Sequence, residues 1–296
     1  MGNRMDYEEF KCVVMEELGQ CFPERGIVLH SGLNGSESVA LVTSSGDVSP
    51  TMTVRNLYEI YRKVSMESAI SQFEAAVLTR GGVPNLGDKR KVVSSYELAR
   101  DKLAFALYNY EANREHLADI VWYRWLDFIL VLVVCLEWQG VYYTMVVEKD
   151  IQAGWNISDE KMYQGIMDNM QKEDWRLTSL SGSSWKPLEC DSVAPALQEG
   201  LYGLSSGKGI LGASAIIVPG FLRCVAQEIG SSSLLILPCS VDWVYIMPVD
   251  RLPDAEDTVK LRRIMQVIAG KGLPPDCWLS DKIYVYRLEV DRVLIL

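Results

Sequence analysis

The chain has 296 residues, of which 49% are hydrophobic and 23% charged, and its formal net charge is −10 at pH 7. This composition is typical of a globular protein with a substantial core and excludes a chain that is disordered over most of its length. The acidic balance disfavours nucleic acid and anionic membrane surfaces as partners, because both require a basic footprint on the protein.

Two kinds of apolar pattern alternate along the first third of the chain. Apolar residues at helical spacing are typical of amphipathic helices, and short β-branched runs are typical of strands. The patterns predict helices over residues 4–19, 55–63 and 66–79, and strands at Ile27–His30 and Val39–Thr43.

The middle of the chain is predicted to contain one long helix followed by a buried β-hairpin. Leucines at helical spacing predict the helix over about Tyr96–Ile120. The hairpin covers residues 126–148, because the β-branched run Phe128–Cys135 and the second run Val141–Val147 flank a Gln-Gly turn.

The most apolar stretch of the chain, Phe128–Leu136, is too short to cross a membrane. It is bounded by Asp127 and Glu137, whereas a spanning helix needs about 20 apolar residues. The polar N-terminus lacks the apolar region of an export signal. The seven cysteines are scattered without a C-x-x-C, which is typical of a reducing compartment. We therefore expect a cytoplasmic protein without a transmembrane segment.

The second half of the chain is predicted to begin with a helix near 158–172, for which Ser158 is a suitable N-cap. Residues 173–199 carry the weakest pattern and are expected to form a linker or a surface excursion. The later elements are expected to be strands at Leu201–Ser205, Ile210–Val218, Leu234–Leu237, Val241–Met247, 283–288 and 290–295, and helices at Phe221–Ile229 and about 254–269.

The mixture of helices and strands lacks the regular alternation of a β-α-β fold. It predicts an α+β fold with mixed or antiparallel sheets and helices packed on them. We expect two lobes that share or adjoin a core, an N-terminal α+β lobe over 1–172 and a C-terminal α+β lobe over 200–296, joined by residues 173–199.

Three glycines match the G-x-G-x-x-G fingerprint of dinucleotide-binding sites: Gly207, Gly209 and Gly212. In that fingerprint a helix follows the glycines, whereas here Ile210–Val218 is short, β-branched at its end and closed by Pro-Gly, as is typical of a strand. A Walker A site is excluded as well, because Lys208 is followed by glycine and not by Ser or Thr. We interpret the glycines as a hairpin turn between two strands and expect no nucleotide cofactor.

The order of elements from Leu201 to Pro248 resembles the C-terminal half of a bacterial family, the domain-of-unknown-function family 5688. The residues that carry the resemblance are Gly212-Ala213, Pro219-Gly220, Leu222, Leu237-Pro238, Ser240 and Pro248. Further matches follow in order along the chain, at Tyr7-Glu8-Glu9-Phe10, Asn109-Tyr110-Glu111-x-Asn113, Leu126-Asp127 and Leu279-Ser280-Asp281. The resemblance implies no activity or substrate. The chain departs from it at Asp242-Trp243, where the family has His-Glu, so any chemistry of that pair is lost here.

The first group of candidate catalytic residues lies near the predicted hairpin. Asn109 and Asn113 are four residues apart and share a face of the predicted helix, with Glu111 between them and Asp127 at the entry to the next strand. Amides can hold a loop or a substrate, and a carboxylate can act as a base. The structural alternative, which we favour, is that the amides bind the hairpin backbone and that Asp127 caps a strand or meets Arg124.

The second group of candidates is Ser240 and Asp242, in a Pro-Cys-Ser-Val-Asp corner where both are first of all turn-forming residues. The two histidines, His30 and His116, have no metal-ligating neighbour at i+3 or i+4. We therefore expect no metal site and no cofactor.

The aromatic content, the acidic charge and the lack of a recognisable catalytic set favour a non-enzymatic module that binds another protein, an adaptor. An alternative is a hydrolase or transferase with Glu111, Asp127 or Asp242 as acid or base, which requires at least two of these residues to meet in one cleft. A second alternative is a nucleic-acid-associated protein of a mobile-element or defence system, which requires a basic face. The sequence does not specify the oligomeric state.

Overall fold

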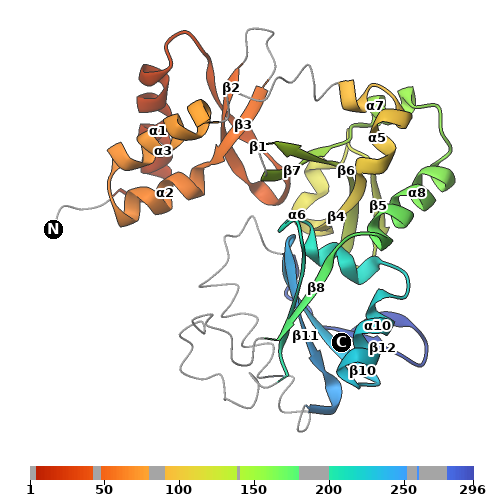
Figure 1. Cartoon of the computed structure of the whole chain (residues 1–296). Coiled ribbons are helices and arrows are strands. Elements are labelled where there is room, and N and C mark those ends of the chain that lie inside the picture. Colours follow the sequence, from red (N-terminus) through yellow and green to blue (C-terminus); the bar gives the residue numbers. More distant parts are fainter. Residues whose placement is uncertain are drawn as a thin grey trace. The chain divides into compact units, whose positions relative to one another are not determined.

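A computed structural model describes residues 5–42, 48–79, 91–138, 141–179, 200–251, 259 and 279–296. The chain divides into two compact units, Met1–Val93 and Ser94–Leu296. Their described residues form three antiparallel sheets with helices packed on them, so the predicted α+β class is confirmed (Figure 1).

The first unit is a three-stranded sheet with helices gathered on one side (Figure 1). Its strand order is β1-β2-β3. The strands are β1 (Ile27–Ser31), β2 (Glu37–Val42) and β3 (Val48–Thr53), and the helices are α1 (Tyr7–Cys21), η1 (Leu33–Gly35), α2 (Val54–Lys63) and α3 (Met66–Thr79). Helices α1–α3 and strands β1 and β2 confirm the predicted elements, whereas β3 was not predicted.

The core of the first unit forms where the helices meet the sheet. Phe10 and Leu18 of α1 are fully buried with Leu41 of β2 and Phe73 of α3. These residues recur at the helical and strand periods, which is why the sequence pattern identified the elements. Asp6 fixes the start of α1, because its Oδ1 accepts a hydrogen bond from Glu9 N at 2.9 Å.

The second unit contains a four-stranded sheet with β6 at its centre. Strand β6 pairs with β4, β5 and β7, and α8 packs on β4. The elements are β4 (Leu103–Asn109), β5 (Trp122–Trp125), β6 (Phe128–Trp138), β7 (Val141–Val146), α7 (Lys149–Gly154) and α8 (Asp159–Gln171). The predicted hairpin and the predicted helix with its Ser158 cap are confirmed, since Ser158 Oγ accepts from Lys161 N at 3.4 Å.

The predicted long helix over Tyr96–Ile120 is wrong. The segment folds instead as α5 (Tyr96–Ala99), η2 (Arg100–Lys102), β4, α6 (Tyr110–Asn113) and η3 (Arg114–His116). Leu103 and Leu107 are four residues apart, as on a helix, but Phe105 between them also alternates with period two. Pairing with β6 buries all three side chains, and this tertiary contact stabilises the strand in preference to a helix.

A six-stranded sheet in the same unit has the order β13-β12-β10-β11-β9-β8. Its strands are β8 (Trp175–Ser179), β9 (Tyr202–Ser206), β10 (Ser233–Ser240), β11 (Trp243–Pro248), β12 (Tyr284–Arg287) and β13 (Arg292–Ile295). The helical elements of this region are η4 (Gly212–Ile217), α10 (Phe221–Ile229) and η5 (Val249–Arg251). Helix α10, strands β9 to β11 and the closing pair β12 and β13 confirm the prediction.

The predicted strand Ile210–Val218 is wrong, because residues 212–217 form the 3₁₀ helix η4. The glycines are therefore not a hairpin turn between two strands. Gly212 lies against the β10–β11 corner so closely that a Cβ there would be 2.0 Å from the carbonyl oxygen of Asp242. Leu211 before it takes the left-handed conformation, with φ 59°. The apolar run is short and β-branched because it is buried, and not because it is extended.

The predicted boundary at residues 173–199 falls within the second unit. Residues 180–199 lie outside the described residues, and the preceding Trp175–Ser179 forms β8, which was not predicted. The division into lobes at this place therefore stays a prediction. The predicted helix at 254–269 also lies outside the described residues, except for Val259. Within the described part of the chain, no helix combines the length and apolar character needed to span a bilayer.

Candidate functional site

A two-residue turn between β5 and β6 holds Asp127 at its tip. Trp125 and Phe128 pair across the turn, and Leu126 takes the left-handed conformation with φ 54°. Such a conformation is unfavourable for a residue with a side chain and persists only where neighbours fix it. Arg124 Nε donates to Leu126 O at 2.7 Å, and Tyr110 N donates to Asp127 O at 3.0 Å. The turn is therefore held from two sides.

The carboxylate of Asp127 is the centre of a buried polar network. Tyr284 Oη donates to Oδ1, and Ser280 Oγ donates to Oδ2 at 3.1 Å. Lys282 Nζ forms an ion pair with Oδ2 at 3.2 Å. Ser280 and Tyr284 are fully buried, and the Asp127 side chain is only 13% exposed. Burial, together with the hydrogen bond to Asp127, raises the pKa of Tyr284.

Asn109 binds the same distant segment as Asp127. Its Nδ2 donates to Leu279 O at 2.9 Å, while its Oδ1 caps α6 by accepting from Ala112 N at 3.0 Å. Asn113 Nδ2 donates to Asn109 O at 2.6 Å. Asn109 and Asp127 therefore have the same role, because each attaches the segment Leu279–Tyr284 to the four-stranded sheet. Glu111 is exposed and pairs with Arg114 at 3.2 Å.

Ser240 and Asp242 belong to a different place, the β10–β11 corner. Asp242 Oδ1 accepts from Leu211 N at 2.9 Å, and Ser240 Oγ accepts from Asp242 N at 3.2 Å. Burial raises the pKa of Asp242 more strongly than the bond to Leu211 lowers it. Ser240 and Asp242 together hold the glycine-containing loop against the β10–β11 corner. Their role in the structure is therefore to form the turn.

The glycine motif itself forms an internal loop. Gly207 N donates to Asp174 O at 2.7 Å, and Gly209 takes a positive φ of 71°. Lys208 Nζ forms an ion pair with Glu173 at 2.5 Å beside a cavity of about 340 Å³ that also contains Cys135. Burial raises the pKa of Cys135 to about 11, so its thiol stays protonated at neutral pH and is a poor nucleophile.

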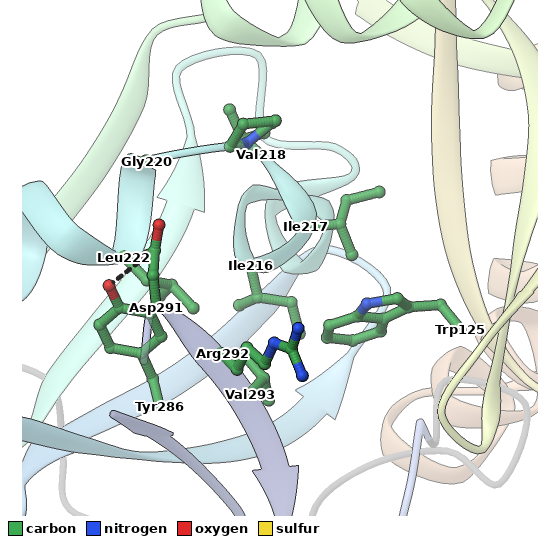
Figure 2. A pocket seen from close by; sticks show the side chains of 11 residues that line it. Trp125, Ile216, Ile217, Val218, Gly220, Leu222, Tyr286, Asp291, Arg292 and Val293 are labelled. Carbon is green, nitrogen blue, oxygen red and sulfur yellow. Dashed lines mark hydrogen bonds between the residues drawn. The ribbon is translucent and has the colours of Figure 1, made fainter. Parts of the chain in front are cut away.

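A second cavity, of about 430 Å³, lies beside Trp125, the last residue of β5 (Figure 2). We call it the Trp125 pocket. Its walls are the 3₁₀ helix η4, the start of α10 and the turn between β12 and β13. The residues that line it include Trp125, Ile217, Leu222, Tyr286, Asp291 and Arg292. Most of the lining is apolar, and a few polar groups converge on it, as in ligand-binding cavities generally.

The two charged residues of the Trp125 pocket differ in their partners. Asp291 accepts from Tyr286 Oη at 2.6 Å and pairs with Arg223 at 2.8 Å. The hydrogen bond from Tyr286, and then the charge of Arg223, lower the pKa of Asp291. Arg292 points into the pocket with Trp125 (Figure 2), and no carboxylate in the described part of the chain pairs with it. The pocket therefore carries one unmatched positive charge.

Sequence reasoning missed this pocket. Trp125 is one of eight tryptophans in the chain, and neither Asp291 nor Arg292 stands in a recognisable motif. One signal was present, because Pro219-Gly220 and Leu222, which carry part of the family resemblance, line the pocket. Nothing in the sequence places them beside residue 125.

The fold is that of an α+β protein built from antiparallel sheets. Its two notable sites are the polar network around Asp127 and the apolar Trp125 pocket with its arginine. A family model described as a family of unknown function, DUF5688, matches residues 7–288, and the chain belongs to this family. Comparisons with curated proteins and with solved structures gave no match. Among the described residues, no group of three or more His, Cys, Asp or Glu side chains is placed to hold a metal ion.

Proposed function

We propose that the protein is a non-enzymatic binding module of the cytoplasm that attaches to another protein through the Trp125 pocket. The observation that carries this proposal is the unmatched guanidinium of Arg292 beside an apolar cavity. A tryptophan and an arginine at one accessible cavity are the residue types that dominate binding energy at protein interfaces. Leu294, Ile295 and Leu296, which follow the pocket residue Val293 in the chain, are 42–47% exposed.

The alternative, a hydrolase or transferase with a carboxylate acid or base, receives less support. Each predicted carboxylate has its own partners: Glu111 pairs with Arg114, Asp127 with Lys282, and Asp242 with a backbone N–H. The hydroxyls next to Asp127 are fully buried and already bonded to it or to each other. A substrate would have to displace these bonds before it reached the carboxylate.

The test is a quantitative capture experiment from native host lysate, with mass spectrometry of retained proteins and small molecules. The proposal expects a stoichiometric protein partner that wild type retains and Arg292→Glu loses. Arg287→Glu is the matched control, because Arg287 is exposed and pairs across β12 and β13 with Arg292, yet does not line the pocket. A retained metabolite or nucleotide without a protein partner would contradict the proposal.

A further inference from the structure

Strand β13 presents a free edge next to the Trp125 pocket. Among the strands that the structure describes, β13 stands at the end of its sheet and pairs only with β12. Leu296 N donates to Ile283 O at 2.9 Å, which continues the β12–β13 register. Because antiparallel bonds alternate along a strand, Arg292 and Leu294 also bond toward β12. Val293 and Ile295 therefore direct their backbone N–H and C=O groups outward.

The two edges of this sheet differ in how they are protected. Natural edge strands are usually blunted by charges, proline or bulges, because bare edges pair with other chains. At the β8 edge, the exposed residues are polar: Arg176, Thr178 and Ser179. At the β13 edge, Leu294, Ile295 and Leu296 are exposed. Each strand carries one exposed arginine, Arg176 or Arg292, but the other exposed residues are polar on β8 and apolar on β13.

The charge at the pocket indicates which kind of chemical group can bind there. The chain carries −10 overall, but Arg223 pairs with Asp291, so Arg292, the exposed first residue of β13, has no carboxylate partner among the described residues. Helix α10 also begins at the pocket with Gly220, which has no side chain to cap it, so the partial positive charge of its first turn adds to that of Arg292. An acidic group is the complement of this environment.

We propose that the partner binds as an extended segment that adds a seventh strand along β13, with an acidic residue at Arg292 and an apolar residue two positions away in the Trp125 pocket. This inference rests on the protein-binding function proposed above and specifies the chemistry of the partner. Val293 connects the strand edge with the pocket, because it is a residue of β13 and also lines the pocket. The backbone bonds contribute affinity, and the pocket and Arg292 contribute specificity, as in other cases of strand addition.

The test uses a random nine-residue peptide library displayed on phage and selected on the full chain. Wild type should enrich peptides with Asp or Glu two positions from a large apolar residue. Arg292→Glu should weaken a selected peptide at least ten-fold and, in a new selection, favour Lys or Arg at the acidic position. Arg287→Glu should change the affinity less than two-fold. Circular dichroism on each variant verifies that it is folded.

Strand addition has its own readout in the same peptides. Only every second peptide N–H can face β13, so N-methylation should weaken binding at least ten-fold at alternate positions and less than three-fold at the positions between. Absence of an acidic-apolar consensus, or an equal effect of N-methylation at all positions, would overturn the inference. If the lysate partner is nevertheless lost on Arg292→Glu, the proposed function stands and only its strand-addition form fails. If the partner is retained, the proposed function itself fails.

Discussion

The Asp127 network and the Trp125 pocket lie on the same β-hairpin turn but differ in how their polar groups are satisfied. In the network, both carboxylate oxygens are bonded, because the buried hydroxyl of Tyr284 donates to Oδ1 and that of Ser280 donates to Oδ2. In the pocket, Arg292 has no carboxylate partner among the described residues. A polar cluster with a perturbed pKa can therefore be a structural attachment, whereas the pocket is the place where we propose that a partner binds.

The largest expected effect is on stability, from Asp127→Ala. The substitution leaves two buried hydroxyls without their acceptor and Lys282 without its partner, so we expect the free energy of unfolding to fall by about 3 kcal/mol. Urea denaturation measures the loss. The control is Glu111→Ala, which removes an exposed ion pair and should cost less than about 0.5 kcal/mol. Equal losses in the two variants would mean that the network does not hold the segment Leu279–Tyr284.

The next effect is on binding, from Trp125→Ala. Removing the indole from the pocket should weaken a selected peptide about 30-fold, or about 2 kcal/mol, as for a central interface tryptophan. Calorimetric titration gives the affinity. Trp122→Ala is the matched control, because Trp122 lies on the same strand but its Nε1 donates to Leu117 O at 3.3 Å and it does not line the pocket. A similar loss of affinity in both variants would remove the pocket from the account.

Alkaline pH should act on the network through Tyr284 and also on the pocket, because burial and the hydrogen bond to Asp291 raise the pKa of Tyr286 to about 12. The folded-state pKa of Tyr284 is raised above its ordinary value of 10.0, so the folded chain holds this proton more tightly than the unfolded chain. The resulting stabilisation is complete below about pH 10 and is lost as the pH rises toward the folded-state pKa, by at most about 1.4 kcal/mol per pH unit. Tyr284→Phe should flatten this slope in denaturation curves recorded between pH 9 and 11. Trp125→Phe should leave the slope unchanged, and a flattened slope there would contradict the assignment.

The smallest expected effect is that of Lys282→Ala. The Lys282 side chain is 46% exposed, so solvent screens its ion pair with Asp127. We expect a loss of about 0.5 kcal/mol in low salt, and no measurable difference from wild type in 1 M NaCl. A loss as large as that of Asp127→Ala would show that the ion pair, and not the hydroxyls, holds the network together.

Local patterns predicted most elements of the fold. The amphipathic helices of the first unit, the apolar hairpin and α10 each repeat their apolar residues at one clear period. Strand β4 was missed because the spacing of Leu103 and Leu107 fits a helix as well as a strand. The 3₁₀ helix η4 was missed because its conformation depends on the close approach of Gly212 to Asp242. These two residues lie 30 positions apart in the sequence.

The candidate site was less predictable, because its parts meet only in three dimensions. The sequence identified Asn109 and Asp127 as notable polar residues, but not their attachment to Leu279–Tyr284, which lies more than 150 positions further along the chain. The Trp125 pocket draws on β5, η4, α10, β12 and β13. No spacing rule connects elements so far apart in the chain, and the partners of an arginine cannot be recognised before its neighbours are placed.

Hydrogen exchange of the full chain, with and without its captured partner, tests the central claim most directly. The account predicts new protection confined to residues 216–222 and to β13, with the largest change at the amides of Val293 and Ile295, whose N–H groups face the free edge. Unchanged exchange in these two segments, with protection appearing around Asp127 and Asn109 instead, would contradict it and would make the polar network the functional site.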